Sequence, residues 1–138
     1  HNIFYFTNQY SETIEQIVNF AEKNNIGVIL VKQAVYFDPV IQKQIEKKSI
    51  DKLILQLQNL RSKPLKGLDY AQSFWIVTIS ILNKQLDKFK DNSNVILVDP
   101  VQKLISTKAH FEDYSHLTPK GNKVIAENIY EELKTKLD

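Results

Sequence analysis

The residues best suited to chemistry lie together in one stretch of the chain. Residues 110–121 read His-Phe-Glu-Asp-Tyr-Ser-His-Leu-Thr-Pro-Lys-Gly and include two of the three histidines. Within this stretch, Asp113 precedes His116 by three residues. In a turn, such a carboxylate can accept a hydrogen bond from the histidine Nδ1–H, which fixes the tautomer and leaves Nε2 as a base. We therefore predict that Asp113 orients His116 and that His116 acts as a general base.

Other interpretations of this stretch stay open at this point. An Asp–His pair close to a helix start is often only a solvated loop or a capping arrangement. His110, Asp113 and His116 could also hold a divalent metal, because imidazole and carboxylate suit zinc or manganese, but their spacing fits no standard site. We expect neither a metal nor a cofactor, and we interpret His110 as a surface loop residue.

The remaining sequence predicts alternating helices and strands that position this loop. Runs of aliphatic, mostly β-branched residues predict buried strands at 26–31 and 95–98. Apolar residues at helical spacing predict helices, with a short one at 101–106 and the others capped by Ser11, Asp38, Ser49, Asp69 and Thr118. The first of these helices is expected to end near residues 23–25. Residues 2–6 are β-prone and are expected to form a connector that leads in from a missing strand.

This alternation predicts an α/β fold with a parallel sheet and right-handed crossovers. Strands that are apolar on both faces fit a sheet covered by helices on each side. Two strands are too few for a stable sheet of this kind. We therefore expect a three-layer α/β/α arrangement of which residues 1–138 form the C-terminal portion of a single domain.

The composition excludes several classes of protein. Eighteen Lys and Arg residues against sixteen Asp and Glu residues give a net charge of +2, whereas nucleic-acid surfaces usually need a clustered positive excess. No stretch approaches the roughly 18 consecutive apolar residues of a membrane span. The absence of cysteine removes disulfides and thiolate chemistry. Without a methionine or a visible signal peptide, the chain is expected to be a piece of a longer protein. The composition does not indicate a compartment.

Aromatic residues form two further groups. Tyr70, Phe74 and Trp75 could form a ligand shelf, although aromatic residues at helical spacing more often belong to the core. The run 4–6, Phe-Tyr-Phe, is expected to form an association patch if its sheet partner is missing.

The segment from Asp113 to Ala126 closely resembles the last conserved block of the SGNH (GDSL-type) hydrolase family. That block is Asp-x-x-His, then a small polar residue, often Pro, a Gly and an amphipathic C-terminal helix. Residues 10–31 and 82–99 are also similar to helix and strand units of the family, but in a pattern general to α/β proteins. The resemblance implies a flavodoxin-like fold, with His116 as the base, Asp113 as its orienting acid and Gly121 at the helix start.

The resemblance also shows what the chain lacks. The family nucleophile lies in a Gly-Asp-Ser block and part of its oxyanion hole in a Gly-x-Asn-Asp block, and neither block occurs here. The resemblance therefore covers only the C-terminal part of the family domain, and this chain alone is expected to be inactive. It further implies that Gln33, Tyr36 and Phe37, after the first strand, contact substrate.

We accordingly expect a serine hydrolase that acts on small acyl esters of a lipid or carbohydrate. Its nucleophilic serine would come from a missing N-terminal segment of the same protein. The alternative is a non-catalytic α/β binding or assembly domain that retains the loop as a remnant.

Overall fold

The computed structural model describes residues 2–137 and shows a mixed α/β chain that is mostly helical. Within these residues, one sheet consists of two parallel strands, β1 (Val28–Val31) and β2 (Val95–Val98). The strands pair in register from Val28 with Val95 to Val31 with Val98. The predicted parallel pairing is therefore confirmed, and β1 begins two residues later than expected.

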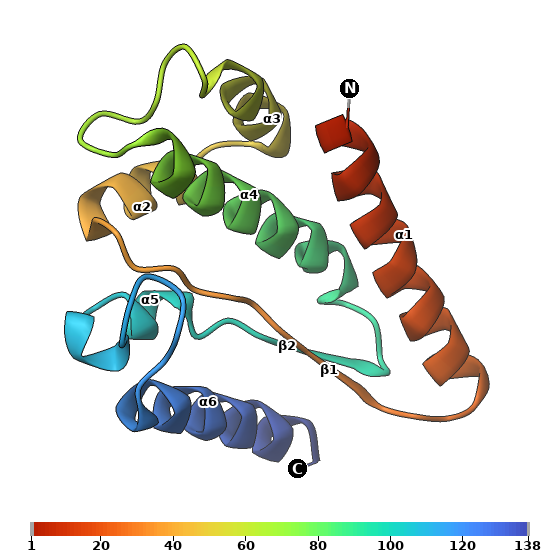
Figure 1. Ribbon diagram of the computed structural model, residues 1–138. Coiled ribbons are helices and arrows are strands. Elements are labelled where there is room, and N and C mark those ends of the chain that lie inside the picture. The colour runs from red at the N-terminus through yellow and green to blue at the C-terminus, as the bar shows by residue number, and fades with distance from the viewer. Residues whose placement is uncertain (1, 138) are drawn as a thin grey trace.

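Helices lie on both sides of the strand pair (Figure 1). On one side are α1 (Asn2–Lys23) and α4 (Tyr70–Leu86), and on the other is α6 (Pro119–Leu137). The shorter elements are α2 (Pro39–Glu46), α3 (Ile50–Asn59), α5 (Val101–Leu104) and the 3-10 turns Asp87–Phe89 and Lys108–His110. Helices α2 and α3 both pack against α4.

Several helix starts follow the predicted caps. The Asp38 carboxylate accepts hydrogen bonds from two backbone N–H groups of α2, and Asp69 forms a capping box with Gln72 at the start of α4. The Thr118 hydroxyl accepts the Gly121 N–H at 3.3 Å in the first turn of α6. Ser49 precedes α3 but makes no side-chain cap bond. These polar side chains satisfy donors that a helix cannot satisfy internally.

The N-terminal segment differs from the prediction. Residues 2–6 are helical, and one helix runs from Asn2 to Lys23 without a start at Ser11. Thr7, Val18 and Ala21 share the buried side of this helix, so tertiary packing outweighs the β propensity of the aromatic residues. The Ser11 hydroxyl accepts a hydrogen bond from Lys88 instead of capping. The predicted end is confirmed, because the helix ends at Lys23 and Asn25, two residues on, adopts a left-handed φ of 55°.

Three hydrophobic clusters hold the elements together. The first joins α3 to α4 and includes the fully buried Leu53 and Ile76. The second lies between α1, the strands and the end of α4, with Val18 and Val95 at its centre. The third joins α5 to the 110–121 segment and contains Val101, Leu104, Ile105 and Phe111. The site-bearing loop is therefore anchored by its own part of the core.

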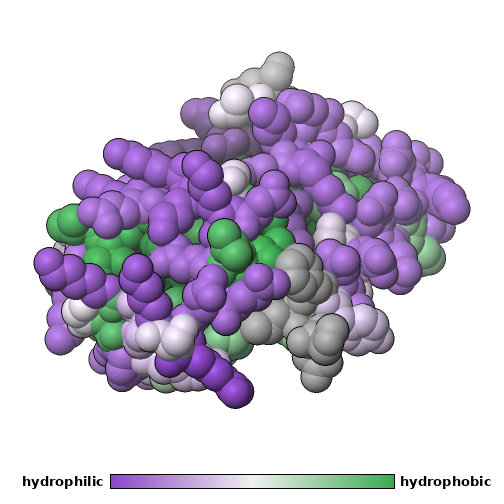
Figure 2. Space-filling view, turned by 90° about the horizontal axis from the view of Figure 1, so that it is seen from above, coloured by the Kyte–Doolittle hydropathy of each residue, from purple (hydrophilic) through white to green (hydrophobic). Residues whose placement is uncertain are grey.

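The cover over the two strands is uneven. Helix α6 packs against β2, where Val98 is fully buried. On β1, by contrast, Ile29 is 42% exposed, so the prediction of a strand buried on both faces is wrong for this residue. Figure 2 shows that hydrophobic side chains also reach the surface among hydrophilic ones when the molecule is seen from above. None of the described helices combines the length and the apolar character that a membrane crossing requires.

A substitution at Gly121 tests the contact between α6 and the loop. A Cβ atom on Gly121 would lie 2.3 Å from the backbone oxygen of His110, which is far inside van der Waals contact. We expect Gly121→Ala to reduce the free energy of unfolding by about 2 kcal/mol in urea denaturation. The control is Gly27→Ala, whose Cβ meets nothing within 4 Å, with a change within about 0.5 kcal/mol. Equal effects of the two substitutions would contradict the close contact.

Candidate active site

The loop that carries Asp113 and His116 is closed at both ends by backbone hydrogen bonds. Phe111, which is buried, forms an isolated antiparallel bridge with Leu117. The Glu112 N–H donates to the His116 oxygen at 2.8 Å, and the Thr118 N–H donates to the His110 oxygen at 3.0 Å. The intervening residues therefore form a tight turn whose ends are fixed in the core.

Within the turn, Asp113 binds both the backbone and the imidazole. Its Oδ1 atom accepts the backbone N–H groups of Ser115 at 2.7 Å and of His116 at 2.8 Å. Its Oδ2 atom lies 2.7 Å from the Nδ1 atom of His116. One carboxylate thus shapes the turn and holds the ring, which is the hydrogen bond predicted from the spacing.

The same contacts change the protonation equilibria of both side chains. The backbone N–H groups of Ser115 and His116, together with the His116 ring, stabilise the ionised Asp113 and hold its pKa well below the usual value. The hydrogen bond to Asp113 and the charge of Asp113 raise the pKa of His116 above its usual value of 6.5. A neutral His116 that donates its Nδ1–H to Asp113 keeps Nε2 as its acceptor.

The imidazole borders a hollow of about 540 Å³ at the carboxyl end of β1. The His116 side chain is 75% exposed, so it is reachable from solvent. The hollow is lined by residues 31–35 at the end of β1, by Trp75 and Ile79 of α4, and by Leu117. A base beside a partly apolar hollow is an arrangement that can bind and activate a small reactant.

The three predicted substrate contacts lie in different environments. Gln33 lines the hollow beside His116. Tyr36 packs on Phe111 with ring centroids 5.3 Å apart, and Phe37 stacks on Tyr114 at 5.2 Å. Tyr36 and Phe37 therefore support the loop, whereas Gln33 is the one of the three that borders the hollow.

Two residues of α4 also contribute to the site, and one of them, Asn83, was not singled out from the sequence. The Asn83 amide clamps the backbone of Gln33: its Oδ1 accepts the Gln33 N–H at 2.9 Å and its Nδ2 donates to the Gln33 oxygen at 2.7 Å. Trp75, interpreted as more often core, is 43% exposed and lines the hollow. No sequence signal distinguishes Asn83 from the other polar residues of its helix.

Two other polar side chains of the loop, His110 and Ser115, bind elsewhere than at Nε2. His110 Nδ1 lies 2.9 Å from the backbone oxygen of Leu104, apart from the Asp113–His116 pair. The Ser115 hydroxyl lies 3.5 Å from the Nδ1 atom of His116 and makes no hydrogen bond to Nε2. Among residues 2–137 there is no group of three side chains suited to hold a metal ion.

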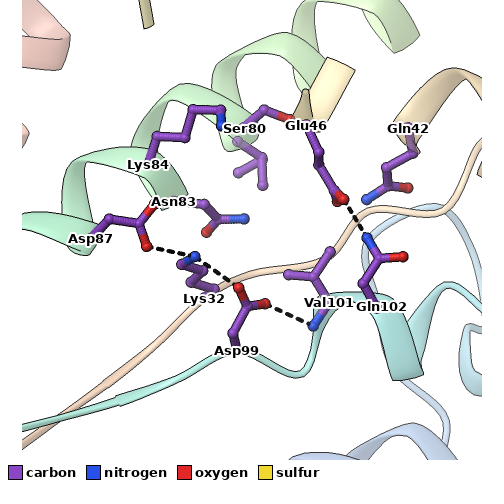
Figure 3. Close-up of a pocket in the computed structure, with 11 residues that line it drawn as sticks. Lys32, Gln42, Glu46, Ser80, Asn83, Lys84, Asp87, Asp99, Val101 and Gln102 are labelled. Atoms are coloured by element: carbon purple, nitrogen blue, oxygen red, sulfur yellow. Dashed lines mark hydrogen bonds and ion pairs between the residues drawn. The ribbon is translucent and has the colours of Figure 1, made fainter. Parts of the chain in front are cut away.

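A separate cavity, polar and of about 180 Å³, lies where the two strands end (Figure 3). Lys32, directly after β1, forms ion pairs of 2.7 Å with both Asp87 and Asp99. Burial alone would lower the pKa of Lys32, but the hydrogen bonds and charges of the two carboxylates outweigh it and raise the pKa. Glu46 accepts a hydrogen bond from Gln102 across the same cavity. Because Lys32 is paired on both sides, we interpret it as a clamp between the strand ends and α4.

Comparisons with protein-family models, with curated proteins and with solved structures gave no match for this chain. The function of Asp113 and His116 is therefore inferred from their geometry and from the resemblance of the segment 113–126. The roles of these residues stay predictions.

A titration of His116 tests the proposed electrostatics. By NMR of the imidazole carbon-bound protons, His116 is expected to titrate above pH 6.5. Asp113→Asn removes the hydrogen-bonded negative charge that favours the imidazolium, so the pKa of His116 should fall. Glu112→Gln is the matched control, because Glu112 acts on His116 only through a smaller charge interaction. A His116 pKa that Asp113→Asn leaves unchanged would contradict the contact.

A substitution at Lys32 tests the clamp at the strand ends. Lys32→Met leaves Asp87 and Asp99 without their cation, but both are about half exposed and can be rehydrated. We expect a loss of about 1–2 kcal/mol in the free energy of unfolding by urea denaturation. Lys103→Met, which removes an exposed pair with Glu131, serves as the control with a loss within about 0.5 kcal/mol. Losses of the same size at both positions would refute the clamp.

Proposed function

We propose that this chain supplies the general base and its orienting acid to an SGNH-type serine hydrolase that acts on small acyl esters. The observation that carries the proposal is the 2.7 Å contact between Asp113 Oδ2 and His116 Nδ1, which leaves Nε2 available beside the hollow. The resemblance of the segment 113–126 supports the same assignment. The nucleophilic serine comes, in this proposal, from an N-terminal segment of the same protein outside residues 1–138.

The chemistry follows from the tautomer that Asp113 selects. The Nε2 atom of His116 accepts the proton of the serine hydroxyl while the serine oxygen attacks the ester carbonyl. The imidazolium that forms is stabilised by the Asp113 carboxylate. His116 then returns the proton to the departing alkoxide, which leaves an acyl-serine. In the second half of the reaction, His116 takes a proton from water as the water oxygen attacks the acyl group, and the proton passes to the serine oxygen.

The lining of the hollow supports a small acyl ester as the substrate. Trp75, Ile79 and Leu117 offer apolar surface, and Gln33 offers a polar side chain. Such a mixture suits an acyl group next to a more polar leaving group. The oxyanion donors, like the serine, belong to the N-terminal segment, which also contributes the strands that complete a three-layer α/β/α fold.

A non-catalytic binding or assembly domain is the second candidate. The observation that favours it is the exposure of large apolar side chains, among them Tyr5, Phe6 and Trp75. The two candidates differ in the sequence that they require upstream of residue 1. A hydrolase needs Gly-Asp-Ser and Gly-x-Asn-Asp blocks there, and an assembly domain does not.

Substitution of His116 in the whole gene product tests the proposed activity. We expect the complete protein to hydrolyse p-nitrophenyl acetate, and His116→Ala to lower kcat/KM by a factor on the order of 10³ or more. Asp113→Asn is expected to lower kcat/KM by about 10² or more, because no carboxylate then holds His116 in the tautomer that leaves Nε2 free to accept a proton. His110→Ala is the control and should leave the rate nearly unchanged. Activity that survives His116→Ala would reject the assignment.

A further inference from the structure

The start of α1 and one face of α4 border a second hollow of about 670 Å³, the α1–α4 hollow. The two helices pack together where Val18 of α1 and Leu86 of α4 belong to one buried cluster, and they diverge towards their starts (Figure 1). The hollow lies in this open part, and Leu57 of α3 also lines it. Its volume falls within the roughly 300–1,000 Å³ of sites that bind small molecules.

The lining of the α1–α4 hollow is largely apolar. Phe6 of α1 and Trp75 of α4 line it and are 57% and 43% exposed. Two of its polar side chains are bound to each other, because the Gln9 amide donates to the Tyr5 hydroxyl at 2.7 Å. None of the described residues that line this hollow carries a charge, whereas charged side chains line the cavity at the strand ends. Such a lining favours an alkyl chain over a phosphate, a sugar or a charged peptide.

The α1–α4 hollow adjoins the hollow beside His116. Gln33, Trp75 and Ile79 line both of them. Trp75 and Ile79 lie one helical turn apart on the same face of α4. The Asn83 amide holds the backbone of Gln33 at both its N–H and its C=O group, so this part of the junction is fixed. A molecule whose reactive end lies beside His116 can therefore extend past Trp75 into the α1–α4 hollow.

We propose that the α1–α4 hollow binds the acyl chain of the ester substrate, and that this chain is unbranched and of medium length, such as octanoyl. The ester carbonyl lies beside His116, and the chain passes Trp75 to contact Phe6, Phe74 and Leu82. This inference rests on the proposed function and names the acyl group that its site accepts.

An acyl chain suits this surface better than a protein partner does. A stable protein interface buries about 800 Å² on each partner, whereas this surface is a hollow of small-molecule size. The chain is also attached to the reacting ester, so its burial can be used to bind the transition state. Each methylene that leaves water completely gains a factor of about four in affinity.

The dependence of hydrolysis on acyl-chain length in the whole gene product tests this assignment. We expect kcat/KM for p-nitrophenyl octanoate to exceed that for p-nitrophenyl acetate at least about 10-fold, since the added methylenes enter an apolar hollow. An octanoate-to-acetate ratio of one or less would overturn the inference.

A substitution that narrows the hollow tests its position. Leu82 is half-buried and lines the α1–α4 hollow but not the hollow beside His116, so Leu82→Trp would place an indole in the path of the chain. We expect this substitution to lower the octanoate-to-acetate ratio at least about fivefold. The matched control is Leu55→Trp, at an exposed position of α3 outside both hollows, and should leave the ratio unchanged. A ratio that Leu82→Trp also leaves unchanged would contradict the assignment.

Photolabelling of the native protein requires neither the serine nor hydrolysis. A decanoic acid that carries a diazirine at the end of its chain is irradiated with the whole gene product, and the labelled peptides are identified by mass spectrometry. We expect the label on residues 5–9 or 74–82, with displacement by an excess of unmodified decanoic acid. No label on these residues, or label that the excess does not displace, would rule out the binding of an acyl chain there.

The two proposals can fail separately. Label in the α1–α4 hollow, together with hydrolysis that survives His116→Ala, would reject the proposed function alone. Hydrolysis that depends on His116, with no preference for octanoate and no label in the hollow, would reject the acyl-chain assignment alone.

Discussion

The parallel pairing of β1 with β2 is the constraint on which the other elements depend. It brings Lys32 and Asp99, the residues that follow the two strands, within 2.7 Å of each other, and Asp87 adds the end of α4 to the same ion-pair group. The segments that continue from these strand ends are the loop from Gln33 onward and the chain that leads to the 110–121 turn. Their backbones meet where the Tyr36 N–H donates to the Tyr114 oxygen at 2.8 Å. The position of His116 beside the end of β1 follows from this arrangement.

The candidate site combines a rigid turn with an open surface. Asp113 uses one oxygen for the backbone of the turn and the other for the imidazole, so the ring is held by the same group that shapes its loop. Yet the side chain of His116 is largely exposed, and its Nε2 atom has no serine partner among residues 2–137. A base that is oriented but uncovered fits a site that a further segment completes.

Much of this arrangement could be predicted from the sequence because it depends on local signals. The caps at Asp38 and Asp69, the valine- and isoleucine-rich strands and the Asp-x-x-His spacing each act over a few residues. The helix after Ser11 was predicted, but its extension back to Asn2 was not, since packing of Thr7 and Val18 in the fold outweighs the β propensity of residues 2–6. Asn83 was missed for the same reason, and the sequence left Trp75 open between a ligand shelf and the core. Their roles depend on contacts across about fifty residues of sequence, which spacing does not encode.

Covalent labelling of the whole gene product addresses the role of His116 most directly. A fluorophosphonate reacts with a serine only when a neighbouring base activates its hydroxyl. After labelling and peptide mass spectrometry, we expect one modified serine, located upstream of residue 1, and loss of this modification in His116→Ala. An absence of labelling in the native protein, or equal labelling in His116→Ala, would contradict a role for His116 as the general base.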